Sequence, residues 1–322
     1  MCEMGLDPGI DHMSANAIIH GVQRIAGSIQ SFKSYCGGLI APESDDNPWH
    51  YKISWNPRNI VLAGKQGAVW LENGKQQEHN YEQLFAGNKK IKVDEVGALA
   101  YYPNRDSMKY LDLYNLPDIK TFVRATLRYP SFMKGWNIVI KAGLVNEQDA
   151  IAVDNITYSD WTASKLGVAN NDGLRDAFKQ KFEADEKEMK QMDWLGLFDN
   201  RRINGKGELS SADILQSLIE DRWKMKTMDK DMVVMHHQID YERKGVMVKL
   251  TSAMVVIGEN RQMSAMSKTV GLPMAILAKK ILLDELSTKN ITGVRIPVMP
   301  EVYVPLLKEL KKHGVEFVET IE

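Results

Sequence analysis

The sequence is poor in cysteine, lacks long apolar runs and has no excess of charge of either sign. Its two cysteines, Cys2 and Cys36, exclude a disulfide framework among 322 residues and favour a reducing cytoplasm. No apolar run reaches about 18 residues and no basic start precedes an apolar stretch, so we expect neither a membrane span nor a signal peptide. The 41 basic and 42 acidic residues balance, which argues against nucleic acid or an anionic membrane as a partner.

Glycine-rich phosphate-binding motifs are missing too. No G-x-G-x-x-G motif follows a predicted strand, and no G-x-x-x-x-G-K-[ST] motif occurs. The nearest string, GKGELS at 205–210, lacks the third glycine and follows a helical segment, which is typical of a surface turn. The sequence therefore offers no phosphate cradle of the usual kinds.

The segments that are present alternate between strand-like and helix-like patterns. Alternation predicts strands over 27–39, 98–103 and 121–130, and two more over 231–259 around a turn at Lys244-Gly245. Asn73-Gly74 predicts the tight turn of another hairpin. Helices are expected over 10–23, 131–144 and 264–285, and Pro273 would lie in the first turn of the last helix or kink it.

The pattern changes after residue 143, where helical spacing continues to about residue 227. One predicted helix there has an apolar side made of Leu174, Phe178, Phe182 and Met189. Ser210 or Ser211 is a natural N-cap for the next helix. We therefore expect an α/β fold, a mixed sheet with flanking helices. An all-helical insertion over 144–227 would separate its first part, 1–143, from return strands over 228–265.

The string GLDPGIDHM at 5–13 combines a Pro-Gly turn with two aspartates and a histidine. Asp7, Asp11 and His12 would suit a metal-dependent hydrolase if all three were ligands. In the alternative interpretation Asp11 caps a helix that begins near His12, and Asp7 bonds the backbone of the turn. The spacing favours this alternative, because no further ligand set follows, and we expect no metal site.

Two other reactive residue types have ordinary explanations. His236 and His237 are adjacent in a predicted strand, so they point to opposite faces and make a poor chelating pair. Cys36 ends an apolar strand, where a cysteine is more often buried and inert than reactive.

Arginines are more informative. Arg105 follows a predicted strand, whereas Arg124 and Arg128 share one strand face with Thr126 between them. An isolated strand arginine is most often a solvated charge, but tyrosines adjoin Arg105 and Arg128 and would partly desolvate them. Such arginines usually have an anionic partner, and a carboxylate is the commonest one.

Six strings in order carry a resemblance to a known family. They are EMGLDPGIDHM, SYCGGLIAPESDDNPWHYKISWNP, YYPNRDSMKY, RATLRY, WLGL and SAMSKTVGLPMAILAKKILLD. In this order they closely resemble the NADP-dependent, glutamate-forming saccharopine dehydrogenases, also called saccharopine reductases. The resemblance runs from residue 2 to the C-terminus, and over 144–225 it rests mainly on WLGL.

The resemblance implies an activity and a cofactor. Enzymes of this family join glutamate to 2-aminoadipate 6-semialdehyde through an imine that takes a hydride from NADPH, which gives saccharopine with its three carboxylates. In the family GLDPG(I/L)DH follows an N-terminal nucleotide-binding half, so we expect NADP to be bound mainly outside these residues. The segment 266–322 would then be C-terminal elements orphaned from a Rossmann-type domain, on which they would pack. The resemblance also implies a homodimer.

The resemblance assigns site residues as well. Those expected to bind substrate are Asp7, Arg105, Thr126, Leu127 and Arg128. Those expected to approach the cofactor are Leu6, Asp7, Pro8 and Asn56, although relatives can have serine at the last position. Asp7 would be the catalytic candidate, as acid, base or orienting group, and would bond the substrate amine or a lysine of the missing half.

Two alternatives stay open at this point. The chain could be a stand-alone module that binds an amino-dicarboxylate or dimerises without catalysis. It could also belong to a related dehydrogenase acting on another amino acid and aldehyde, such as a carboxynorspermidine-forming enzyme. In each case the expected partner is a small molecule rather than nucleic acid or membrane.

Overall fold

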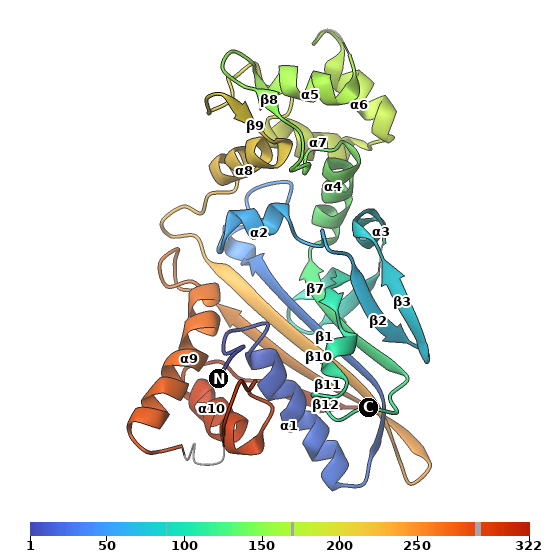
Figure 1. The fold of residues 1–322 in the computed structure, drawn as a ribbon, viewed down its shortest axis with the longest axis vertical. Coiled ribbons are helices and arrows are strands. Elements are labelled where there is room, and N and C mark those ends of the chain that lie inside the picture. The colour runs from blue at the N-terminus through green and yellow to red at the C-terminus, as the bar shows by residue number, and fades with distance from the viewer. Residues whose placement is uncertain (88, 169–170, 287–290) are drawn as a thin grey trace.

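The computed structural model describes residues 1–87, 89–168, 171–286 and 291–322, and its centre is one mixed sheet (Figure 1). Among the described residues the strands are β1 (Ser28–Ile40), β2 (Ala68–Glu72), β3 (Lys75–His79), β4 (Lys90–Val93), β5 (Gly97–Pro103), β6 (Arg105–Asp106), β7 (Thr121–Arg128), β8 (Ile151–Ala152), β9 (Glu208–Leu209), β10 (Asp231–Arg243), β11 (Val246–Ile257) and β12 (Val318–Ile321). The main path of the sheet runs β12-β11-β10-β1-β7-β2-β3.

Helices lie beside the sheet and beyond one end of it. They are α1 (Ile10–Arg24), α2 (Pro57–Val61), α3 (Tyr81–Ala86), α4 (Pro130–Lys141), α5 (Tyr158–Leu166), α6 (Leu174–Phe182), α7 (Glu186–Leu195), α8 (Ser211–Arg222), α9 (Ala265–Leu282) and α10 (Pro300–Lys312), with 3-10 turns at Pro42–Ser44 and Met108–Tyr110. No helix among the described residues is long and apolar enough to cross a membrane.

Strand β7 lies inside the sheet with partners on both edges. It runs parallel to β1, where Cys36 faces Thr126 across the ladder, and antiparallel to β5, where Ala100 faces Arg128. It also pairs with β2 through Phe122. The backbone of Arg124 is therefore held on both sides, by Ser34 of β1 and by the Asn104 N–H, whereas Arg128 is paired with β5 alone.

One face of the sheet is covered by α1, α9 and α10. The shared core includes Ile10 and Met13 of α1, Val233 and Met235 of β10, Met254 of β11, Ile276 of α9 and Leu306 of α10. These strand residues alternate with residues that point away, as a half-covered sheet requires. His237 therefore faces α1, where it hydrogen-bonds Ser14, whereas the neighbouring His236 packs beside Tyr35. The predicted opposite orientation of the two histidines is confirmed.

A second core connects the sheet to the helical part at the top of Figure 1. Trp49, Trp136, Trp161 and Trp223 are all fully buried in it. Trp49 donates from Nε1 to the Gln191 carbonyl across 2.9 Å, which ties the loop after β1 to α7. Large aromatic side chains contribute most of the apolar burial in such a core.

The sequence predicted an all-helical region over 144–227, but the structure shows strands there as well. Strands β8 and β9 pair through Ile151 and Leu209, so a short two-stranded ladder accompanies α5 to α8. The predicted apolar helix is also two helices, because Glu183 has a φ of 52° and ends α6. Asp185 then starts α7 with a capping box. The division at 143/144 and 227/228 stays a prediction.

The structure confirms two local predictions, one for a turn and one for a helix cap. Asn73 and Gly74 have φ values of 53° and 74° and join β2 to β3, as expected of a hairpin turn with both central residues at positive φ. Ser210 caps α8 as predicted. Pro273 lies inside α9 and not in its first turn, so of the two predicted alternatives the kink of the helix stays a prediction.

The C-terminal segment contributes to this same sheet. Strand β12 pairs antiparallel with β11, and α9 and α10 pack on α1 and β10. The outer side of α9 nevertheless exposes apolar residues, namely Val270 (44%), Met274 (62%), Ile281 (41%) and Leu282 (84%). The expected packing of 266–322 against a Rossmann-type domain stays a prediction, and this exposed side is the surface available for it.

Candidate functional site

The turn before α1 is closed by its own backbone. Gly5 donates to the Pro8 carbonyl, and Ile10 and Asp11 donate back to Gly5 and Leu6. Gly9 is the N-cap and has a φ of 151°; a Cβ atom there would lie 2.1 Å from the Gly5 oxygen. Only glycine fits this conformation without displacing the turn. The turn therefore presents Asp7 next to the first turn of the helix.

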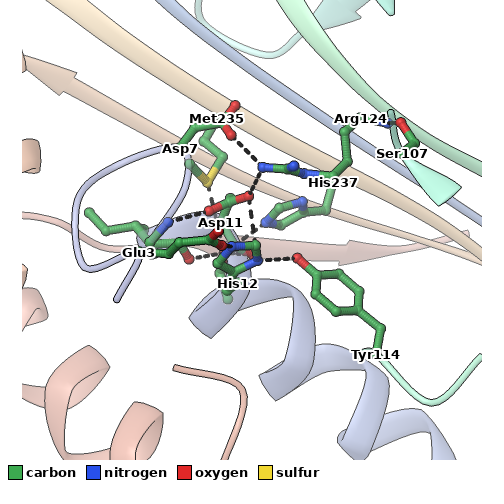
Figure 2. A network of polar contacts seen from close by, with 12 residues as sticks. Glu3, Asp7, Asp11, His12, Ser107, Tyr114, Arg124, Met235 and His237 are labelled. Atoms are coloured by element: carbon green, nitrogen blue, oxygen red, sulfur yellow. Dashed lines mark hydrogen bonds and ion pairs between the residues drawn. The ribbon is translucent and has the colours of Figure 1, made fainter. Parts of the chain in front are cut away.

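Arg124 of β7 binds both aspartates of this turn (Figure 2). Its Nη2 atom lies 2.5 Å from Asp7 Oδ1 and 2.6 Å from Asp11 Oδ2. The Asp11 side chain is 1% exposed and that of Asp7 18%, so the pairing occurs largely away from water. Such charge-assisted bonds are about twice as strong as neutral ones.

The sequence suggested that Asp11 caps the helix, but the structure shows that it does not. The helix begins at Ile10, and the Asp11 side chain instead accepts a hydrogen bond from the Gly9 N–H at 2.6 Å. Asp7 likewise does not bond the turn backbone but pairs with Arg124. Both aspartates instead bind Arg124, which lies 117 positions after Asp7 and 113 positions after Asp11. The rules for local turns do not predict a partner so far along the chain.

The electrostatics separate the two aspartates. Burial raises the pKa of Asp7 to about 6; the charge of Arg124 opposes this shift and that of Asp11 adds to it. Burial also disfavours the Asp11 carboxylate, yet Arg124, His12 and the Gly9 N–H hold the pKa of Asp11 below its usual value. One guanidinium thus serves two carboxylates, and the proton rests on Asp7 first.

His12 extends the network beneath the aspartates. Its Nε2 atom lies 2.6 Å from Glu3 Oε2, and its Nδ1 atom lies 2.7 Å from the Tyr114 hydroxyl. A carboxylate only accepts, so His12 donates from Nε2 and, in a neutral ring, Tyr114 donates to Nδ1. Both ring nitrogens are engaged, which fixes the ring behind Asp11.

Arg124 is held from the other side by the segment after β5. The Ser107 hydroxyl accepts the backbone N–H of Arg124 at 3.1 Å, and the Tyr110 ring lies 4.1 Å from its guanidinium carbon. A guanidinium over an aromatic face is stabilised by the quadrupole of the ring. The YYPNRDSMKY string therefore contributes to the positioning of Arg124.

The predicted substrate residues of β7 divide between its two faces. Thr126 and Arg128 share the Arg124 face by alternation, and Thr126 is partly exposed there. The Leu127 side chain is fully buried in the core on the opposite face. A substrate contact of Leu127 would therefore use its backbone.

Arg128 is a buried cation without an anionic partner among the described residues. It is 4% exposed, its Nη1 donates to the Leu127 carbonyl at 2.8 Å, and its Nε has no hydrogen-bond partner in the described part of the chain. The rings of Tyr51 and Phe132 lie 5.5 and 5.6 Å from the guanidinium carbon. A buried charge that lacks a counter-ion is costly, so this position suits an anionic ligand.

Arg105 is exposed, and its charge lowers the pKa of Asp7, which places the guanidinium within electrostatic reach of that carboxylate. The charges of the neighbouring residues also affect the pKa of the buried Cys36 thiol. Burial raises the pKa of Cys36 well above its usual value, Asp7 and Asp11 raise it further, and Arg124 and Arg128 lower it. Arg105 and Arg128 therefore act on one neighbourhood around Asp7 and Cys36.

The residues expected near the cofactor differ in their exposure. Leu6 packs in the core beside Cys36, whereas Pro8 is exposed next to Asp7. Asn56 is the N-cap of α2, where its Oδ1 accepts the Arg58 N–H at 2.9 Å. Only the Nδ2 group of Asn56 is then free of hydrogen bonds among the described residues. Pro8 and Asn56 thus remain accessible to a cofactor.

No three His, Cys, Asp or Glu side chains in the described ranges are placed to hold a metal ion. Asp11 is bound by Arg124, and His12 by Glu3 and Tyr114. Arg124 is the site residue that sequence reasoning did not assign. Its signal was present, because period-two spacing puts it on the face that also carries Thr126 and Arg128.

Comparison with known proteins identifies the family. The model of the saccharopine dehydrogenase C-terminal domain matches residues 5–315. A saccharopine dehydrogenase (NADP(+), L-glutamate-forming) of Saccharomyces cerevisiae is 35% identical over 325 residues, covering 98% of this chain and 72% of the relative. The mitochondrial alpha-aminoadipic semialdehyde synthase of Bos taurus is 33% identical over 331 residues, covering 98% of this chain and 34% of the relative.

A solved structure agrees with these sequence matches. An apo histidine-tagged saccharopine dehydrogenase (L-Glu forming) from Saccharomyces cerevisiae superposes with a TM-score of 0.88 at 34% identity, over 99% of this chain and 73% of that one. The chain thus spans about a third of the bovine relative and just under three quarters of the yeast one. It belongs to the saccharopine dehydrogenase family, and its residues correspond to the C-terminal domain of that family.

Proposed function

We propose that this chain is the substrate-binding and dimerisation part of an oxidoreductase. The enzyme would interconvert saccharopine with L-glutamate and 2-aminoadipate 6-semialdehyde, with NADP(H) as cofactor. The names of the yeast and bovine relatives and the match to the C-terminal domain model support this proposal. The observation that carries it is Arg128, a buried cation that lacks a carboxylate partner within the described residues.

Saccharopine brings three carboxylates, which fit the cations of this site. One carboxylate would bind Arg128, whose aromatic neighbours Tyr51 and Phe132 shield the pair from water. Arg105 would bind a second carboxylate at the exposed edge, with the Thr126 hydroxyl beside them. Arg124 is already neutralised by Asp7 and Asp11, so we assign it a positioning role.

Asp7 would handle a proton at the substrate nitrogen. Its pKa, raised to about 6 by burial, lets it change protonation state close to neutral pH. The network behind Asp7 orients its carboxyl group. Arg124 Nη2 binds Oδ1 of Asp7 and also Oδ2 of Asp11, so one guanidinium holds both carboxylates. Such orientation is what an acid or base needs in order to act on one particular atom.

NADP(H) would supply or accept the hydride when bound. We propose that a nucleotide-binding domain holds most of the cofactor and that Leu6, Pro8 and Asn56 meet it from this chain. The sequence has no glycine-rich phosphate turn of its own, and the yeast relative is NADP(+)-dependent by name. The exposed apolar side of α9 would provide a docking surface for that domain.

Homodimerisation would use the face of the sheet that α1 does not cover. There β11 and β12 expose the apolar side chains of Met247 (55%), Ile257 (48%) and Val318 (70%). Exposed apolar surface of this kind is typical of a protein–protein interface. Sedimentation analysis of Val318→Glu against the unchanged protein tests this. A cytoplasmic location fits the two cysteines, both free.

The experiment that tests the function uses the whole natural gene product that contains this chain. Saccharopine oxidation is followed by NADPH absorbance, with Arg128→Gln compared with Arg243→Gln at an exposed strand end. Loss of a charge-assisted pair of about 1.5–3 kcal/mol should raise the KM for saccharopine about 10- to 150-fold in Arg128→Gln alone. Equal KM values in the two variants would remove Arg128 from the site, and absence of NADP-linked turnover would refute the activity.

A further inference from the structure

A cavity of about 360 Å³ lies between α1 and the C-terminal elements of the chain. Its walls come from α1, α10, β11 and the segment that leads into β12. Ile18, Leu307 and Phe317 give it apolar sides, while Ser14 and Ser252 contribute hydroxyl groups. Its volume is enough for a small metabolite and falls within the range of ordinary ligand pockets.

One polar group that lines the cavity, and one beside it in the sheet, have no partner among the described residues. Ser252 is fully buried and lines the cavity, yet its Oγ has no hydrogen-bond partner among the described residues. His237 faces Ser252 across the β10–β11 ladder, and its Nδ1 is also unpartnered within the described chain. Its Nε2 lies 2.7 Å from the Ser14 hydroxyl. Buried polar atoms normally find a partner, so the Ser252 hydroxyl indicates a ligand atom in the cavity.

That ligand atom has to be neutral. Burial lowers the pKa of His237 to about 3, so the imidazole carries no charge at physiological pH, and Phe32 and Phe317 stack on its two sides. An ionised group placed here would find no counter-charge. A hydroxyl or a carboxamide, which both donates and accepts, would satisfy Ser252 at no such cost.

The mouth of the cavity carries charges of both signs. Lys311 and Glu316 pair with each other at the rim. Lys308 and Glu319 also line the cavity, and neither forms an ion pair within the described residues. An unpaired cation and an unpaired carboxylate at one opening complement a zwitterion, whose two charged groups then remain in partial contact with water.

We propose that this cavity binds a free α-amino acid whose aliphatic side chain ends in a neutral hydrogen-bonding group. The α-carboxylate binds Lys308, the α-ammonium group binds Glu319, and the methylene groups lie between Ile18, Leu307 and Phe317. The terminal hydroxyl or amide reaches Ser252. The site is distinct from the one around Asp7 and Arg128, and the proposal does not depend on the proposed function.

The test is a calorimetric titration of the protein with 6-hydroxy-L-norleucine. Two matched compounds each lack one group: L-norleucine lacks the terminal hydroxyl, and 6-hydroxyhexanoate lacks the ammonium. We expect each to bind at least about tenfold more weakly, because each leaves one buried or charged partner unsatisfied.

Variants locate the binding site. Ser252→Ala and Lys308→Glu should each weaken binding of 6-hydroxy-L-norleucine about tenfold or more. Lys187→Glu on the remote α7 should leave binding unchanged, and so should Arg128→Gln, which separates this cavity from the substrate site. The surface variant Lys308→Glu keeps the test decisive if Ser252→Ala fails to fold. Absence of binding, or binding that Arg128→Gln abolishes and Lys308→Glu spares, would overturn the proposal.

Discussion

Arg124 binds Asp7 across 117 positions of the chain, with Nη2 2.5 Å from Oδ1. The same nitrogen also binds Asp11, so two carboxylates share one positive charge in a largely buried place. This arrangement keeps Asp11 ionised and leaves Asp7 as the member that takes up a proton near neutral pH. The pair therefore combines a fixed charge with a titrating group, and its consequences can be measured.

Stability should fall as pH rises from about 4 to about 6, through the titration of Asp7. Its folded-state pKa of about 6 exceeds the unfolded value of 3.8, so the native state binds more protons in this window. The difference between these two pKa values corresponds to at most about 3 kcal/mol. Asp7→Asn should flatten this part of the profile in urea unfolding measured from pH 4 to 7.5. The exposed Asp118→Asn is the control, and an unchanged slope in Asp7→Asn would contradict the assignment.

Replacement of Arg124 by methionine should destabilise the protein strongly. It leaves Asp7 and Asp11 buried without their cation, a change that typically costs about 3–5 kcal/mol. The loss should be smaller at pH 5, where Asp7 is protonated and needs no counter-ion. Urea denaturation at pH 5 and pH 7.5 measures both effects. Arg105→Met, at an exposed position, should stay within about 0.5 kcal/mol of the unchanged protein; similar losses for both would count against the buried pairing.

Gly9 and Gly21 in and before α1 should respond to alanine in opposite directions. A Cβ atom at Gly9 would lie 2.1 Å from the Gly5 oxygen, so Gly9→Ala has to open the turn that holds Asp7. At Gly21, inside the helix, a Cβ atom meets nothing within 4 Å. Gly21→Ala should therefore stabilise by about 0.4–1 kcal/mol, whereas Gly9→Ala should lose more than about 2 kcal/mol. Thermal unfolding of the two variants decides, and equal shifts would show that the turn is not constrained.

Residues 1–322 alone should bind NADPH weakly or not at all. The contacts that a glycine-rich turn and a helix N-terminus make to the cofactor phosphates have no counterpart in the sequence. Fluorescence titration of the isolated chain with NADPH measures this directly. A micromolar dissociation constant would show that these residues carry a cofactor site of their own.

Local chemistry determined what the sequence could predict. The helix after Gly9, the Asn73-Gly74 hairpin and the opposed His236 and His237 all follow from turn and alternation rules within a few residues. The break at Glu183 was not signalled, because the apolar spacing continues across it. The pairing of Asp7 with Arg124 depends on the register of β1 with β7 and on the position of α1 on the sheet. Neither is encoded within one window of sequence.

The order of the strands has a consequence for how the chain acquires its structure. Strand β1 pairs with β7 about ninety residues later and with β10 about two hundred residues later. The central ladder thus stays open until most of the chain has left the ribosome, whereas α5 to α8 contact one another locally. Such separations slow the search for native pairing. During synthesis the helical segment can collapse early, while β1 has no partner on its β10 side until about two hundred further residues have been translated.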